Sequence, residues 1–144
     1  MSGFLLDTNL VSELIKPRPK LEVRKWVDSV EESLLYLSVL TLGEIRKGIA
    51  VLPDIARKQV LELWLQNDLQ LRFSGRILSV DEGIADRWGW IAGKSSASGR
   101  PLAVIDGLLA ATALHHNMTL VTRNAKDVFG TGVIVFSPWD SSIA

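Results

Sequence analysis

Short apolar runs that alternate with helix-length segments constrain the fold of this chain more than any other feature. Phe4-Leu5-Leu6 is the first such run, and short apolar runs bounded by turn residues are typical of buried parallel strands. Strands that alternate with helices predict a layered α/β fold, with a mainly parallel sheet of about five short strands flanked by helices. We expect strands at 4–6, 34–37, 76–80, 119–121 and 133–136. We expect helices at 8–15, 21–30, 54–69 and 103–115, and one that begins at Thr41 and ends between Gly48 and Pro53. A further helix is capped by Asp81 and carries Ile84, Ala85, Trp88 and Ile91, and a small-residue turn follows at 95–99.

The size and composition fit one globular domain spanning residues 1–144. The chain has 144 residues, 47% of them hydrophobic, which is enough to build a core. It has no cysteine, which excludes disulfide scaffolds, cysteine zinc sites and thiol nucleophiles. The start of the chain lacks a basic signal-peptide region, and the longest apolar stretch, 101–114, is too short to cross a bilayer. We therefore expect a cytoplasmic protein that does not contact membranes.

The formal net charge is zero, which argues against a protein held to nucleic acid by a global positive field. Any contact with RNA must then be local, through a few basic side chains or through a metal ion. Arg46, Arg100 and Arg123 are candidates for contact with RNA phosphate or a protein partner, and ordinary surface solvation is the alternative for each.

Three acidic residues stand in apolar surroundings. Asp7 follows the first predicted strand, Glu44 lies near a helix start, and Asp106 interrupts an otherwise apolar helix. Asp7 could simply cap a helix, and Thr41-x-x-Glu44 fits a capping box. Asp106 has no comparable local explanation, although a buried hydrogen-bond partner could accommodate it. One acidic cluster explains all three residues together.

Such a cluster favours phosphodiester hydrolysis. Several carboxylates cannot ionise side by side without a cation between them. Mg²⁺ and Mn²⁺ prefer hard oxygen ligands, and such an ion can activate water and stabilise a leaving oxygen. The residues alone therefore indicate a metal-dependent hydrolase of phosphodiesters.

The order of the motifs resembles that of PIN domains along essentially the whole chain. The opening Leu5–Glu13 segment resembles the first PIN motif, and segments 38–48, 106–113, 120–124 and 136–139 resemble the later ones. The likeness is greatest to the VapC and FitB toxins of bacterial toxin–antitoxin pairs. It implies a PIN-like three-layer fold and a Mg²⁺-dependent endoribonuclease, in which Mn²⁺ can substitute. It also implies an RNA substrate, a homodimer and a cognate antitoxin with a DNA-binding domain.

The resemblance also assigns roles to individual residues. It implies that Asp7 and Asp106 bind the metal, that Glu44 binds metal or positions water, and that Thr8 and Thr122 orient the site by hydrogen bonding. Asn124 stands where many relatives have an aspartate, which puts a second metal in doubt. Asp127 is a possible substitute, with capping of the short helix after Arg123 as the alternative reading.

Three other functions compete with this interpretation. A PIN fold without catalysis could serve as a protein-binding module, and a DNA nuclease could use the same metal chemistry. A phosphatase with Asp7 as nucleophile would have a second aspartate where this chain has Asn9.

Overall fold

A five-stranded parallel sheet forms the centre of the structure, a computed structural model that describes residues 3–140. The strands are β1 (Phe4–Leu6), β2 (Leu35–Ser38), β3 (Ile77–Leu78), β4 (Thr119–Val121) and β5 (Val135–Phe136). Their order across the sheet is β3-β2-β1-β4-β5, and every neighbouring pair is parallel. The predicted α/β fold with a parallel sheet is therefore confirmed.

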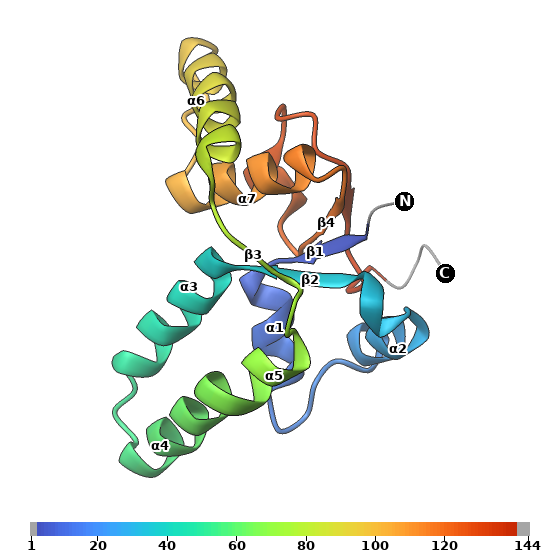
Figure 1. Cartoon of the computed structure of the whole chain (residues 1–144), viewed down its shortest axis with the longest axis vertical. Helices are drawn as coiled ribbons and strands as arrows, with labels where there is room; N and C mark the ends of the chain where they lie inside the picture. Colours follow the sequence, from blue (N-terminus) through green and yellow to red (C-terminus); the bar gives the residue numbers. More distant parts are fainter. Residues whose placement is uncertain (1–2, 141–144) are drawn as a thin grey trace.

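Helices cover both faces of this sheet (Figure 1). One side carries α6 (Glu82–Ala97) and α7 (Val104–His115). The other side carries the following helices: α1 (Thr8–Leu14), α2 (Leu21–Ser29), α3 (Val39–Ala50), α4 (Ile55–Leu63) and α5 (Gln70–Arg72). Short 3-10 helices lie at Glu32–Leu34 (η1) and Ala125–Val128 (η3), and a π-helical segment (η2, Trp64–Leu69) joins α4 to α5. No helix among residues 3–140 is long and apolar enough to cross a membrane.

The alternation of side chains along β1 builds two separate cores. Leu6 packs with the helices of the α1 side, whereas Leu5 packs with Leu109 and Ala113 of α7. Both leucines are fully buried, as expected for a strand covered on its two faces. The sheet is therefore rigid where its strands end, and those ends carry the candidate site.

Two predicted helix boundaries were wrong. The third helix begins at Val39 and not at Thr41, because the buried Ser38 accepts a hydrogen bond from the Leu40 amide and caps it. Glu44 therefore lies beyond the first turn, and the capping box proposed for it does not form. The small-residue turn predicted at 95–99 is largely helical, since α6 continues to Ala97.

Other boundaries moved less. The predicted helix at 54–69 continues through its π-helical segment to Arg72. The strands predicted at 76–80 and 133–136 each shorten to two residues. These differences of a few residues lie where helix and strand ends are least determined by local sequence.

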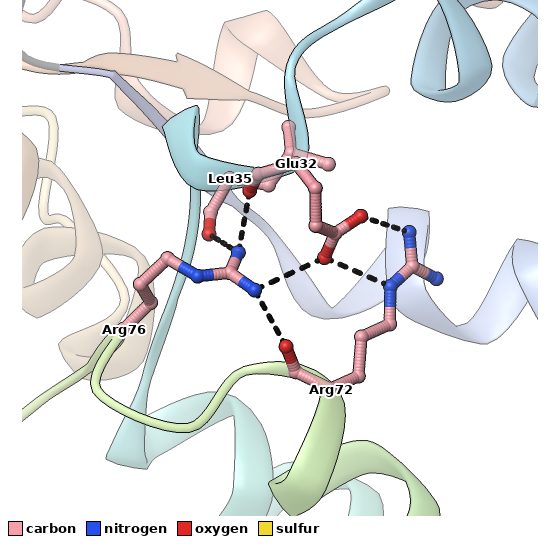
Figure 2. Close-up of polar contacts among 4 residues, drawn as sticks. All are labelled: Glu32, Leu35, Arg72 and Arg76. Carbon is pink, nitrogen blue, oxygen red and sulfur yellow. Dashed lines mark hydrogen bonds and ion pairs between the residues drawn. The ribbon is translucent and has the colours of Figure 1, made fainter.

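A polar network ties the end of α5 to the start of β2 (Figure 2). Arg76 donates hydrogen bonds to the carbonyl oxygens of Glu32, Leu35 and Arg72, at 2.6, 2.6 and 2.5 Å. The Glu32 carboxylate accepts hydrogen bonds from the side chains of Arg72 and Arg76, which lowers the pKa of its carboxyl group. The Arg76 guanidinium therefore binds carbonyl oxygens of three elements, η1, β2 and α5. It joins two segments about forty residues apart in the sequence.

Gly107 lets α7 approach α6 closely. A Cβ atom at this position would lie 2.8 Å from Leu102 Cδ2 and 3.0 Å from the Trp88 ring. Any larger residue would push the first turn of α7 away from α6. The glycine therefore helps to fix the position of its neighbour, Asp106.

Candidate metal centre

The candidate site lies at the carboxyl ends of β1 and β4. The strand order reverses between these two strands, and open α/β sheets bind ligands at such a switch point. The register pairs Leu6 with Val121, so Asp7 and Thr122 leave the sheet side by side. The Asp7 amide donates to the Val121 carbonyl at 2.9 Å, which continues the ladder by one bond.

Both carboxylate oxygens of Asp7 accept hydrogen bonds from the protein. Oδ1 accepts from the Thr8 amide at 2.7 Å, which makes Asp7 the N-cap of α1, and Oδ2 accepts from Thr122 Oγ1 at 2.7 Å. Burial raises the pKa of the Asp7 carboxyl group, the two hydrogen bonds oppose this effect, and the charge of Asp127 adds to it. The net shift is upward. Asp7 is thus both the cap of α1 and a largely buried carboxylate whose ionised form a cation would stabilise.

Glu44 faces the same site from α3. Its Oε1 accepts a hydrogen bond of 2.5 Å from Thr8 Oγ1, and Thr41 Oγ1 lies 3.3 Å from the same hydroxyl. Thr8 therefore connects the first turn of α1 to Glu44. The hydrogen bonds made by Thr8 and Thr122 fit the orienting role that the family resemblance implies for them.

Asp106 enters the site from the first turn of α7. Burial raises its pKa to about 6, and the charges of Asp127, Asp7 and Glu44 contribute to the shift in that order. Three carboxylates from three other segments therefore lie within electrostatic reach of Asp106. At neutral pH their mutual repulsion is a cost that a bound cation would remove.

Asp127 is the acid whose position the sequence did not determine. The short helix η3 begins after Asn124, and no side chain forms a capping hydrogen bond there, so the capping role considered for Asp127 is wrong. Its charge instead raises the pKa of both Asp7 and Asp106. Asn124 contributes its backbone amide, which donates to Thr122 Oγ1 at 3.2 Å. That its side chain binds metal stays a prediction.

The donor set fits a hard divalent cation in chemistry, because every candidate ligand is a carboxylate oxygen. Among residues 3–140, however, no three acidic or histidine side chains lie close enough to form a complete ligand shell as they stand. The acids surround the site and repel one another across it. We therefore expect small side-chain rotations on metal binding.

The three candidate arginines lie on three different segments of the chain. Arg46 is exposed on α3, two residues after Glu44. The Arg100 guanidinium lies 5.0 Å from the centre of the Phe129 ring, and that of Arg123 lies 5.7 Å from the Trp139 ring. These cation–π contacts hold two of the arginines in defined positions.

Glu13 is a buried acid that sequence reasoning missed. It is 3% exposed and accepts hydrogen bonds from Lys16 Nζ and the Lys20 amide, each at 3.0 Å. Burial raises its pKa, but these hydrogen bonds and the Lys16 charge outweigh burial and lower it overall. Glu13 therefore stabilises the turn after α1. The basic residues at 16 and 20 are the only sequence signal that could have indicated its role.

Comparisons with known proteins agree with this geometry. Residues 4–129 match the family model for the PIN domain. The chain is 39% identical to Toxin FitB of Neisseria gonorrhoeae over 135 residues, which cover 94% of this chain and 97% of that protein. It is 31% identical to VapC ribonuclease Y4jK of Sinorhizobium fredii over 136 residues, covering 94% and 97% of the two chains. Its fold matches the crystal structure of FitAcB from Neisseria gonorrhoeae with a TM-score of 0.90, at 39% identity and covering 95% and 99% of the two chains.

Proposed function

This chain belongs to the PIN-domain family, and from that premise we propose that it is a metal-dependent endoribonuclease acting as the toxin of a toxin–antitoxin pair. The observation that carries the proposal is that Asp106 lies within electrostatic reach of Asp127, Asp7 and Glu44, with Asp7 at the switch point of the sheet. The similar proteins named as a toxin and a ribonuclease support the choice of substrate and role.

Asp7, Asp106 and Glu44 would hold Mg²⁺, for which Mn²⁺ can substitute. A metal ion bound there supplies a nucleophilic hydroxide and stabilises charge on the phosphate and the leaving oxygen. Thr122 fixes Asp7 by donating to Oδ2, and Thr8 fixes Glu44 by donating to Oε1. These hydrogen bonds set the directions of two carboxylates before substrate binds, which reduces the reorganisation needed during the reaction.

RNA binding requires local positive charge, since the chain as a whole is neutral. Arg46, Arg100 and Arg123 would supply it by contacting phosphates on either side of the scissile bond. The guanidinium groups of Arg100 and Arg123 each lie over an aromatic ring, which restricts their positions. We also propose a cytoplasmic location, where such an enzyme would meet cellular RNA.

Purified protein, freed of any antitoxin, is expected to cleave RNA when Mg²⁺ or Mn²⁺ is present and to stop when EDTA is added. The reaction would be followed on a labelled RNA and on a DNA of the same sequence in parallel. Protein with Asp7→Asn, purified identically, is the control for contaminating nucleases and is expected to be inactive. Cleavage of DNA alone would mean a DNA nuclease, and cleavage of neither nucleic acid together with no binding of Mn²⁺ would mean a binding module.

We further propose that an antitoxin binds along the face of α4. A groove of about 550 Å³ between the end of α1 and α4 is lined by Ile15, Val60, Leu63 and Trp64, among others. Val60 and Leu63 are each more than half exposed, although they are apolar. Such a surface fits an apolar segment of a partner.

The chain is also proposed to form a symmetric homodimer, the commonest closed assembly.

Leu63→Glu is expected to weaken binding of the cognate antitoxin by at least about tenfold, because it places a charge in an apolar contact. The antitoxin would be the product of the adjacent short gene, with affinity measured by calorimetry. Val51→Glu is the matched control, since Val51 is 74% exposed and does not line the groove. An equal loss of antitoxin affinity in both variants, or no loss in either, would contradict this binding face. Light scattering of the chain alone tests the dimer.

A further inference from the structure

The side chain of Asn9 connects α1 to the segment that follows β4. Its Nδ2 donates to Thr122 Oγ1 at 3.2 Å, and its Oδ1 lies 3.4 Å from the amide of Arg123, which donates to it. Asn9 stands two residues after Asp7, in the first turn of α1. It contacts no acidic side chain in these hydrogen bonds, so its effect on the site must pass through Thr122.

The hydrogen bonds of Thr122 determine where its hydroxyl proton points. A hydroxyl group has one proton to donate and two lone pairs to accept with. Thr122 Oγ1 accepts from Asn9 Nδ2 and from the Asn124 amide, each at 3.2 Å, and donates to Asp7 Oδ2 at 2.7 Å. Both lone pairs face N–H donors. The proton is therefore left with one acceptor, Asp7.

We propose that Asn9 is a positioning residue for the metal centre, which keeps the Thr122 hydroxyl donating to Asp7 and so fixes the direction of that ligand. The inference rests on the proposed function, because it assumes that Asp7 binds the metal. Thr122 is 1% exposed, so water cannot easily replace the missing donor. Partners of metal ligands that lie outside the first coordination shell change metal affinity by about 10–100-fold.

Asn9→Asp is the sharpest test because it preserves the shape of the side chain and exchanges the donor for an acceptor. Two carboxylates then compete for the single proton of Thr122. Simple charge counting predicts tighter Mn²⁺ binding in this variant, since it gains a negative charge near the site. The proposal predicts the opposite, with Mn²⁺ affinity lowered by about tenfold or more and RNA cleavage restored in part at high Mn²⁺. Asn67→Asp, at an exposed position on η2, is the charge-matched control.

A double-mutant cycle separates positioning from a general structural role. Thr122→Val removes the hydroxyl, and Asn9→Ala should then add no further loss of Mn²⁺ affinity, although it lowers affinity in the wild-type background. Thr122→Ser keeps the hydroxyl and should retain most of the affinity. Thermal unfolding measured beside each titration shows whether a variant is folded. The cycle of Asn9→Ala with Thr122→Val still decides the question if Asn9→Asp does not fold.

The outcomes distinguish this inference from the proposed function. A wild-type chain that binds no Mn²⁺ contradicts the proposed function itself. A wild-type chain that binds Mn²⁺ while Asn9→Asp binds it equally or more tightly overturns the positioning role alone. Additive losses in the double-mutant cycle overturn it as well.

Discussion

Asp106→Asn is expected to abolish RNA cleavage and, in the same protein, to raise thermal stability at pH 8 in EDTA. Loss of a metal ligand should lower the cleavage rate by more than about 100-fold, since the metal contributes several kcal/mol of charge stabilisation. The gain in stability has a separate cause. Burial and the charges of Asp127, Asp7 and Glu44 raise the pKa of Asp106 to about 6, so its ionised form is unfavourable in the fold.

The sign of this effect follows from the direction of the pKa shift. Between about pH 4 and pH 6 the unfolded chain has lost the Asp106 proton while the folded chain still holds it. The contribution of this group to stability therefore falls as pH rises through that window and is fully lost above it. Asparagine removes the penalty. The expected rise in melting temperature at pH 8 is about 2–5 °C, the shift that roughly 1 kcal/mol produces, an amount already reduced for solvent screening.

Scanning calorimetry at pH 5 and pH 8, with and without Mn²⁺, measures both effects. Wild type should gain stability from Mn²⁺ at pH 8, and Asp106→Asn should gain much less. Asp28→Asn, at an exposed position on α2, should match wild type in every condition. A variant that is no more stable than wild type at pH 8 in EDTA, or that still cleaves RNA, would contradict the role given to Asp106.

The layers of the fold could be predicted because each strand is covered on both faces. Phe4-Leu5-Leu6 has no polar residue, and only a strand buried between two layers tolerates such a run. The helix starts were harder to predict where two capping residues compete. Ser38 and Thr41 are both suitable N-caps, and β2 leads directly into α3 without a loop that would mark the boundary. α6 continues to Ala97 through small residues that in isolation indicate a turn.

Residues of the candidate site could be predicted where they follow a strand or interrupt an apolar helix. They could not be predicted where their position depends on contacts between segments far apart in the sequence. Asp7 was identifiable because parallel strands end at one edge of the sheet, and Asp106 because it interrupts an apolar helix. Asn9 carries no comparable signal, since its role depends on hydrogen bonds to residues 113 and 114 positions later. Asp127 is similar: its distance from Asp7 and Asp106 is set by three segments that meet only in the folded chain.

Asp127→Asn is expected to weaken binding of a second Mn²⁺ by more than about tenfold and to extend binding of the first to lower pH. Asp127 is exposed on η3 and its charge raises the pKa of both Asp7 and Asp106, which makes it a candidate for the fourth ligand. In wild type, protons compete with the first Mn²⁺ as pH falls through about 6, the pKa of Asp106. Without Asp127 that pKa falls, so the competition moves to lower pH.

Asn124→Asp provides the matched comparison, because it restores the acid that many relatives have at this position. If Asp127 is the fourth acid, Asn124→Asp should increase the affinity for the second Mn²⁺ in the wild-type background. In the Asp127→Asn background, Asn124→Asp should restore only part of the lost affinity. Calorimetric titrations at pH 5.5 and pH 8, with cleavage rates measured on the same samples, separate the two positions. We expect Asp127→Asn to lower the rate by about 10–100-fold. Titrations of Asp127→Asn that superimpose on those of wild type at both pH values would place Asp127 outside the metal centre, because neither its charge nor its oxygens would then act on the ion.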